Sequence, residues 1–188
     1  MPFDHSLRLP AAALLMPLAL LSAAHAEVRE TSAGEPYTVQ GILAADVRSN
    51  MNSARTGGYD ARTTWTIDWR YSYKRAPGGG CAIAGVTTDL AIVTRLPRLN
   101  TQNVALQQSF STYLARLKLH ENGHAANGRT TAGRIDAGIG ALPAAATCKE
   151  LSVIANALGD QLIREGTAAD VAYDQRTNHG STQGALWP

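Results

Sequence analysis

The pentapeptide His-Glu-Asn-Gly-His at positions 120 to 124 has the residue types and spacing of a zinc site. Residues four apart lie on the same face of an α-helix, so His120 and His124 can bind one metal ion together. Glu121 lies about 100° around the helix axis, beside the two imidazoles, where its carboxylate can act as a base. The motif therefore predicts a metal-dependent hydrolase with these three residues at its centre.

A catalytic zinc site needs a third protein ligand and one open position for water. His5 and His25 lie in a segment that we expect to be removed, so a third histidine ligand has to be His179. The metzincin spacing, with a histidine six residues after the second, is absent because Thr130 stands there. The alternatives to His179 are acidic oxygen ligands, namely Asp174, Asp170 and Glu150.

The helix that carries the motif is predicted from a repeating stripe between residues 101 and 128. The stripe recurs every three or four residues and consists of Leu106, Phe110, Tyr113, Leu117, His120 and His124. This spacing is typical of one helix face packed on a core. Asn100 or Thr101 can cap the start of the helix, and Gly128 is expected to end it. The two histidines thus continue a buried face.

The rest of the pattern predicts a single α+β domain over residues 27–188. Residues 62–74 alternate aromatic and polar side chains, as in a half-buried antiparallel strand, and residues 81–96 supply the second strand of a hairpin. Pro97 is expected to end that strand. We also expect a polar lead-in after residue 26, a strand at 37–40, helices at 42–55 and 151–162, and a polar tail from residue 172.

The first 26 residues are predicted to be a secretory signal peptide. Arg8 precedes an apolar run at 11–21, and the small-x-small ending at 24–26 predicts cleavage before Glu27. The apolar run is too short to span a bilayer. We therefore expect a periplasmic or secreted protein with no stable membrane insertion after cleavage.

Cys81 and Cys148 are the two cysteines of the chain, and an even pair in an oxidising compartment predicts a disulfide. Closing a loop of that length stabilises a fold by roughly 4 kcal/mol in the chain-entropy treatment. The formal net charge is +2 and the arginines are scattered, so no basic stripe indicates nucleic-acid binding. The expected partner is a peptide or protein substrate.

Several stretches together resemble a bacterial family catalogued as domain of unknown function 922. These are "HENGH", the block "YDQRTNHGSTQGA" at residues 173–185, the tryptophan-rich strand, and the single cysteine before a Leu-Pro. The resemblance covers nearly the whole mature chain. The family is described as predicted secreted zinc-dependent proteases, so the resemblance implies a zincin-like hydrolase. Because His179 lies in the matched block, the resemblance also supports it as a ligand.

The leading hypothesis is a zinc metallopeptidase that holds one Zn²⁺ through His120, His124 and His179. Glu121 would take the proton of the attacking water. Tyr173, close in sequence to the proposed third ligand, is a candidate donor to the developing oxyanion.

Two other hypotheses make different demands on the structure. A zinc-stabilised binding module without turnover would replace the open position by a fourth protein ligand, such as Asp174. A metal-free interaction protein would use an exposed aromatic face that includes Trp65 and Trp69. Neither needs Glu121 as a base.

Overall fold

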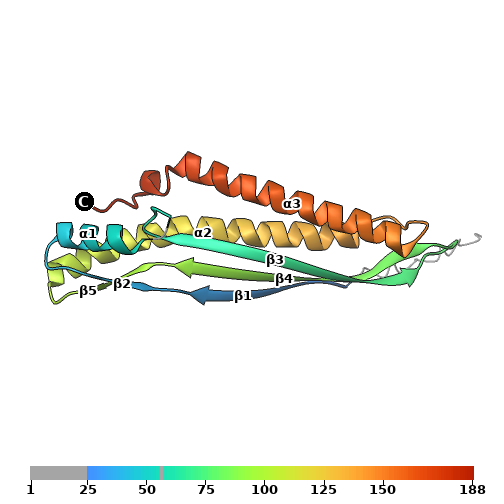
Figure 1. Cartoon of the computed structure of the whole chain (residues 1–188), viewed down its shortest axis with the longest axis horizontal. Coiled ribbons are helices and arrows are strands. Elements are labelled where there is room, and N and C mark those ends of the chain that lie inside the picture. The colour runs from blue at the N-terminus through green and yellow to red at the C-terminus, as the bar shows by residue number, and fades with distance from the viewer. Residues whose placement is uncertain (1–24, 56) are drawn as a thin grey trace, which may run out of the picture.

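The computed structural model describes residues 25–55 and 57–188 and shows a mixed α+β protein, which confirms the predicted class (Figure 1). The predicted signal peptide lies mostly in residues 1–24, outside the described part. The elements are, in chain order, β1 (His25–Gly34), β2 (Tyr37–Gln40), α1 (Ala44–Ala54), β3 (Arg62–Arg75), β4 (Cys81–Arg95), β5 (Pro97–Asn100), α2 (Val104–Gly140), α3 (Cys148–Thr177) and the short 3-10 helix η1 (Ser181–Gln183).

The molecule is elongated and layered, with a sheet on one side, α2 lying along it, and α3 outermost (Figure 1). The sheet has three strands in the order β1-β4-β3, and β4 pairs antiparallel with β3 and parallel with β1. The predicted hairpin of β3 and β4 is therefore confirmed, with Trp65 opposite Ile92.

The polar lead-in expected after residue 26 is a strand, β1, which was not predicted. From Glu27 to Gly34 its residues are exposed, so no alternation of apolar and polar side chains marks it as a strand. Its backbone instead pairs along one edge of β4, from His25 opposite Gly85 to Gly34 opposite Thr94. Backbone pairing of this kind leaves little signal in the sequence.

Strand β4 ends at Arg95, just before Pro97 as expected, but a further short strand that was not predicted follows. Pro97 is the first residue of β5, which pairs parallel with β2, where Tyr37 lies opposite Pro97. The first position of a strand tolerates proline because no ladder donor is needed there. The Tyr37 amide donates to the Leu96 carbonyl at 3.0 Å, so the β1–β4 pairing leads directly into the β2–β5 pairing.

Helix α2 does not end at Gly128 but continues to Gly140. Beyond the two histidines the buried stripe goes on through Thr131, Ala132, Ile135 and Ile139. Gly128 has a packing role instead: a Cβ at this position would lie 2.8 Å from Cγ of Trp65. Glycine therefore lets the aromatic strand approach the helix closely.

Helix α3 is also longer than the predicted 151–162. It begins after Thr147, whose side chain accepts a 3.1 Å bond from the Glu150 amide, and it ends at Asn178 in the left-handed conformation. It therefore includes residues 163–171, for which no helix was predicted, and the first part of the predicted polar tail, residues 172–177. This extension brings the end of α3 alongside the middle of α2.

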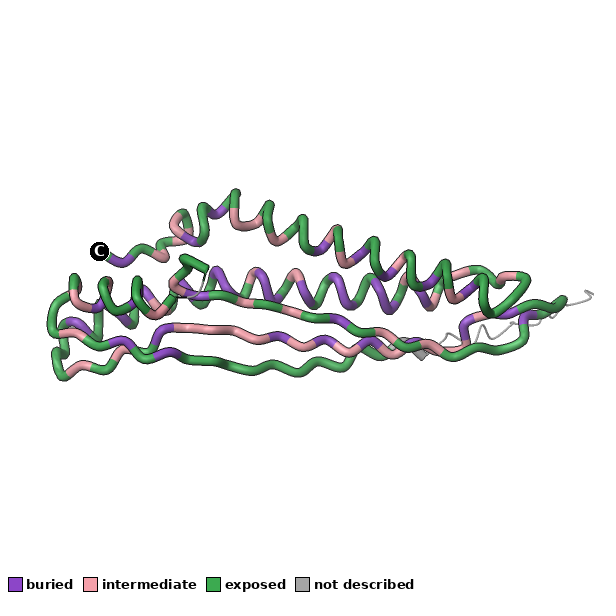
Figure 2. The backbone as a smooth tube through the Cα atoms, in the orientation of Figure 1, coloured by how far each residue is buried: buried purple, intermediate pink, exposed green. Residues whose placement is uncertain are grey.

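Two apolar clusters form the core, and α2 contributes to both (Figure 2). One lies between the sheet, α2 and α3, and includes Leu90, Ile135, Ile139 and Leu151, all at most 1% exposed. The other joins α1, β2 and the start of α2 to the C-terminal segment, where Trp187 packs on Phe110 and Tyr113. The motif histidines lie where α2 passes from one cluster to the other.

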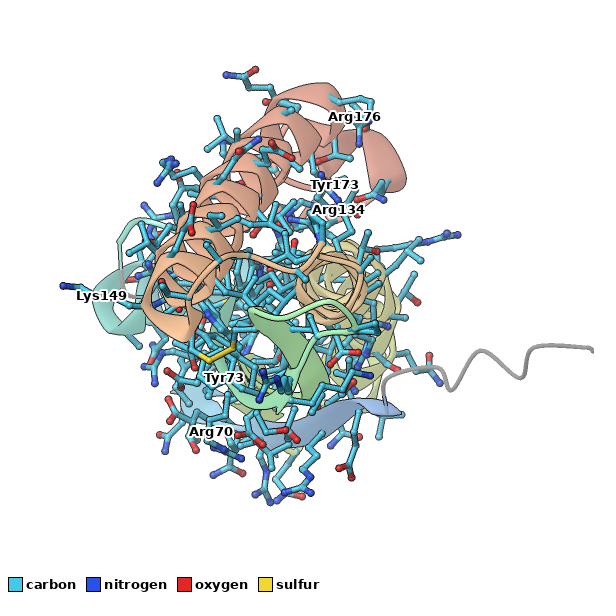
Figure 3. The ribbon with its side chains drawn as sticks, turned by 90° about the vertical axis from the view of Figure 1, so that its right-hand side faces the viewer. Arg70, Tyr73, Arg134, Lys149, Tyr173 and Arg176 are labelled. Carbon is cyan, nitrogen blue, oxygen red and sulfur yellow. A yellow bond between two sulfur atoms is a disulfide. The ribbon has the colours of Figure 1, made fainter. Side chains whose placement is uncertain are left out.

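The predicted disulfide between Cys81 and Cys148 is present (Figure 3). It joins the first residue of β4 to the first residue of α3, at the end of the molecule far from the motif. Backbone bonds of 2.9 Å in both directions between Cys81 and Ala145 reinforce this junction. Among the described residues, no helix combines the length and apolar character needed to cross a membrane.

Trp65 and Trp69 of β3 are partly buried against α3 and do not form the exposed face that a metal-free interaction protein would use, whereas Tyr73 near the end of the strand is 40% exposed. Trp65 and Trp69 pack against the main core and donate their ring N–H groups to Asp170 at 2.7 Å and Asn156 at 3.2 Å. On α3, a Cβ at Gly159 would overlap the Trp69 ring. Helix α3 can lie this close to the sheet because that position has no side chain.

We predict that Gly159→Ala destabilises the protein by about 1–3 kcal/mol, because the added methyl group overpacks against Trp69. Gly133→Ala is the matched control, since Gly133 is an exposed position inside α2 where a Cβ meets no atom within 4 Å. That change should stabilise the protein by up to about 1 kcal/mol through helix propensity. Urea denaturation measures both, and equal effects of the two changes would contradict the packing argument.

Candidate metal centre

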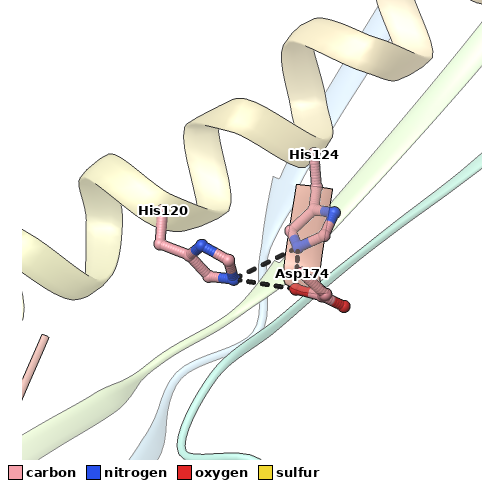
Figure 4. A group of neighbouring side chains, drawn as sticks. All are labelled: His120, His124 and Asp174. Atoms are coloured by element: carbon pink, nitrogen blue, oxygen red, sulfur yellow. Dashed lines mark hydrogen bonds and ion pairs between the residues drawn. The ribbon is translucent and has the colours of Figure 1, made fainter. Parts of the chain in front are cut away.

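Three side chains from two helices bring their donor atoms to a common point (Figure 4). The Nε2 atoms of His120 and His124 are 3.3 Å apart, and each lies 3.1 Å from Oδ1 of Asp174. The histidines are one turn apart on α2, and Asp174 comes from the last turns of α3. The site therefore depends on the antiparallel packing of the two long helices.

The hydrogen bonds behind the two rings leave both Nε2 atoms without a proton in the neutral form. Nδ1 of His124 lies 2.9 Å from Oδ1 of Asp170, which as a carboxylate can only accept, so Nδ1 carries the hydrogen. Nδ1 of His120 lies 3.1 Å from Oε1 of Gln183, which imposes the same tautomer. Two nitrogen lone pairs and a carboxylate oxygen thus face each other, an arrangement that could hold a cation.

The spacing of the three donors fits a tetrahedral zinc ion. Zn–N and Zn–O bonds are about 2.0–2.2 Å, so neighbouring ligand atoms in a tetrahedron are separated by roughly 3.3–3.6 Å. The observed separations of 3.1, 3.1 and 3.3 Å are close to this value. The group of two nitrogens and one oxygen could therefore hold a metal ion, and its donor set suits zinc.

Glu121 lies in the same cavity and is 4% exposed. One of its carboxylate oxygens, Oε2, is buried and has no hydrogen-bond partner within the described structure. Burial raises the pKa of the carboxyl group, although a hydrogen bond with Thr63 and the nearby histidines partly oppose this. A buried carboxylate with a free acceptor oxygen and a raised pKa has the properties of a general base.

Asp170 and His124 form a second pair behind the three donors. Burial opposes a charge on His124, but the hydrogen bond to Asp170 and the neighbouring carboxylates together raise its pKa. Burial raises the pKa of Asp170, yet hydrogen bonds from His124, Asn127 and Trp65 outweigh this and lower its pKa. Asp170 therefore orients a histidine rather than joining the group itself, and protons compete with a metal for His124 as the pH falls.

Tyr173 packs on both histidines. Its ring is stacked on His120, with centroids 5.1 Å apart and planes 9° apart, and meets His124 edge to face. Its hydroxyl donates to the His120 carbonyl at 3.2 Å. The position between the motif histidines explains Gly123, because a Cβ there would overlap the Tyr173 hydroxyl and ring. In this geometry Tyr173 holds the rings in place, and its predicted role as oxyanion donor stays a prediction.

His179, the predicted third ligand, lies at the border of the group. Its Nδ1 is 3.5 Å from Oδ1 of Asp174, its side chain is 47% exposed, and its ring packs against Tyr59 with centroids 5.0 Å apart. The backbone at Asn178 and His179 has positive φ angles of 46° and 50°, and this turn brings the ring back towards the end of α3. The compact group of three contains Asp174 in its place.

Glu150, the remaining candidate ligand, cannot reach the site. It lies in the first turn of α3, 24 residues before Asp174, which corresponds to about 36 Å along the helix. It was considered because a glutamate on the helix after the motif can complete a zinc site with two histidines, as in thermolysin.

A cavity of about 540 Å³ opens beside the three donors. Its other wall comes from the loop after α1 and the start of β3, including Tyr59, Asp60 and Thr63. Sequence reasoning missed this wall, and it also missed Gln183, the hydrogen-bond partner of His120. The spacing of Asp170, Tyr173 and Asp174, at i, i+3 and i+4, was the available signal that these residues share one helix face.

Comparison with known proteins identifies a family for the chain. The profile of the family described as "Bacterial protein of unknown function (DUF922)" matches residues 35–180, a span that includes the three donors and Glu121. No match was found among curated proteins or among solved structures. The resemblance seen in the sequence is thus confirmed at the level of the family, whereas the protease activity associated with it stays a prediction.

We predict that the purified protein binds one zinc ion and that Asp174→Asn weakens binding far more than His179→Ala. The reason is that Asp174 lies 3.1 Å from both nitrogens, whereas His179 is at the border of the group. Asp170→Asn should cost about 10–100-fold in affinity, as expected for a partner that orients a ligand. Competition with a chromophoric chelator measures all three. Loss of zinc in His179→Ala, with retention in Asp174→Asn, would return His179 to the ligand set.

A second prediction concerns the metal-free protein and the pH. Because the pKa of Glu121 is raised in the folded state above its usual 4.5, the folded protein binds this proton more tightly than the unfolded chain. Stability is therefore lost as the pH rises from about 4.5 through the folded-state pKa. Chelator-treated Glu121→Gln should be more stable than the wild type at pH 7–8 and equal to it near pH 4. Thermal unfolding measures this, and a gap that does not change with pH would contradict it.

Proposed function

The chain belongs to the bacterial DUF922 family, and we propose that it is an exported zinc-dependent peptidase that hydrolyses a peptide or amide bond. The observation that carries the proposal is the meeting of two imidazole nitrogens and one carboxylate oxygen beside a buried glutamate. The arrangement combines a metal site and a base in one cavity. We accordingly propose a zincin-like relationship for the helix that bears the motif.

In this proposal His120, His124 and Asp174 hold the ion, which when bound supplies a Lewis acid that polarises a carbonyl group and activates water. Asp170 and Gln183 keep the two rings in the tautomer whose Nε2 atoms face the ion. Glu121 accepts the proton of the attacking water and passes it to the leaving amine. Its unpartnered Oε2 atom supports this assignment.

The outer edge of β3 supports a peptide as the substrate. β3 is an end strand of the three-stranded sheet, and its first residues, Arg62 and Thr63, line the cavity. An extended peptide can add to such an edge through main-chain hydrogen bonds. A substrate bound there would run past the three donors and Glu121. Export is proposed from the N-terminal sequence, and the Cys81–Cys148 disulfide is consistent with an oxidising compartment.

The position of His179 favours a second candidate function, a zinc-stabilised module without turnover. Its Nδ1 atom is 3.5 Å from Asp174 Oδ1, so a small movement of the turn at Asn178 would add a fourth protein ligand. Four protein ligands are typical of structural zinc sites, whereas three and an open position are typical of enzymes. Hydrolysis distinguishes the two candidates directly.

We predict that Glu121→Gln keeps one zinc ion and lowers hydrolysis of a quenched-fluorescence casein by at least about 100-fold, because the general base is lost. Asp136→Asn is the matched control. Asp136 is also a buried carboxylate on α2, 4% exposed and bonded to Thr88, but it lies roughly 22 Å further along the helix. Full activity of Glu121→Gln would end the catalytic assignment, and no activity in the zinc-loaded wild type would favour the structural site.

A further inference from the structure

The cavity wall opposite the motif is strongly cationic. Four arginines gather at this end of the molecule, and we call them the arginine wall: Arg48, Arg55, Arg62 and Arg95. Arg55 and Arg62 line the cavity itself, together with His120, Glu121 and Asp174. In the described structure the carboxylate paired with this wall is Asp60, so positive charge is in excess.

Among the four arginines, Arg48 is the one that donates a hydrogen bond to Asp60 in the described structure. Its Oδ2 accepts from Arg48 Nη1 and from the Tyr113 hydroxyl, both at 2.7 Å. Arg48 also donates to the Trp187 carbonyl at 2.9 Å, so its guanidinium is committed. The other oxygen, Oδ1, is buried without a hydrogen-bond partner and lies 3.8 Å from Arg55 Nη1. Arg55 is therefore near Asp60 but not hydrogen-bonded to it.

Arg62 and Arg95 add positive charge that no carboxylate in the described part of the chain balances through an ion pair. Arg62 forms no ion pair within the described residues, and its Nη1 lies 3.9 Å from the place where a Cβ on Gly57 would be, against the loop that lines the cavity. Arg95, opposite Arg62 in the β3–β4 register, stacks over Tyr37 at 4.7 Å and donates to the Ala54 carbonyl at 3.2 Å. Both arginines thus contribute to the positive field beside the metal centre.

We propose that Arg55 and Arg62 bind a carboxylate of the substrate while the scissile bond lies at the three donors. This inference rests on the proposed hydrolase function and names its substrate class: peptides that carry a negatively charged group near the cleaved bond. Arginine suits this role because its planar fork matches the two oxygens of a carboxylate. A more highly charged anion is less suitable, since Glu121, Asp170 and Asp174 lie in the same cavity.

The test uses zinc-loaded protein and dicarboxylic acid monohydroxamates of increasing chain length. The hydroxamate binds the metal, and the free carboxylate at the other end can reach the arginine wall. Each probe is compared with its carboxamide counterpart by calorimetry. At the best length the carboxylate should bind at least about tenfold more tightly, as expected for hydrogen bonds to a charged group. This preference should weaken as salt is added.

Arg55→Gln and Arg62→Gln should each reduce that preference severalfold. Arg98→Gln is the matched control, because Arg98 is an exposed arginine of β5 that does not line this cavity. Equal affinity of carboxylate and carboxamide at every length would overturn the inference and leave the hydrolase proposal intact. A failure of every hydroxamate to bind the zinc-loaded protein would overturn both.

A second arm distinguishes the two sources of a carboxylate in peptides. Inactive Glu121→Gln is titrated with acetylated penta-alanine that has either a free or an amidated C-terminus. Amidated versions with one central glutamate or glutamine complete the set. Tighter binding of the free C-terminus would indicate recognition of a chain end, and tighter binding of the glutamate peptide would indicate recognition of an acidic side chain. No difference between the members of either pair would overturn the inference.

Discussion

The candidate site depends on the close antiparallel contact between α2 and α3. The two donor nitrogens belong to α2, and the donor oxygen belongs to Asp174 of α3. Asp170, which orients His124, also lies on α3. The contact is close because glycines stand where side chains of the other helix cross: a Cβ at Gly123 of α2 would overlap Tyr173, and a Cβ at Gly166 of α3 would overlap Thr131. Glycine inside a helix costs about 1 kcal/mol relative to alanine. That cost is offset here by the packing that brings the two helices into register.

The same packing explains the electrostatics of the site. Burial raises the pKa of Glu121, and one of its oxygens has no hydrogen-bond partner within the described structure, which is unfavourable for stability but useful for accepting a proton. His124 remains well oriented because Asp170 is itself held by Trp65 from the sheet. The aromatic strand, α3 and the motif helix therefore form one connected polar network, in which each layer supplies one member.

Local patterns in the sequence were enough to predict the hairpin, the helical placement of His120 and His124, and the disulfide. The errors came from features whose cause lies elsewhere in the fold. Gly128 looked like a helix end because its partner, Trp65, is more than sixty residues away. β1 was missed because its residues from Glu27 to Gly34 are exposed and show no alternation, while its backbone pairing with β4 leaves no pattern in the sequence. The end of α3 looked like a polar tail, so the position of Asp174 on a helix face beside the two histidines was not seen.

The disulfide and the metal group lie near opposite ends of α3, 26 residues apart from Cys148 to Asp174, or about 39 Å along the axis. Over that length, a tilt of only about 5° about the cystine would displace the carboxylate by roughly 3 Å, the full spacing between donor atoms. The angular tolerance of the helix is therefore very small. The packing of Trp69 against Gly159 and of Trp65 against Gly166 limits this tilt near the middle of α3. The precision of a site at one end of the helix is therefore set by contacts in its middle.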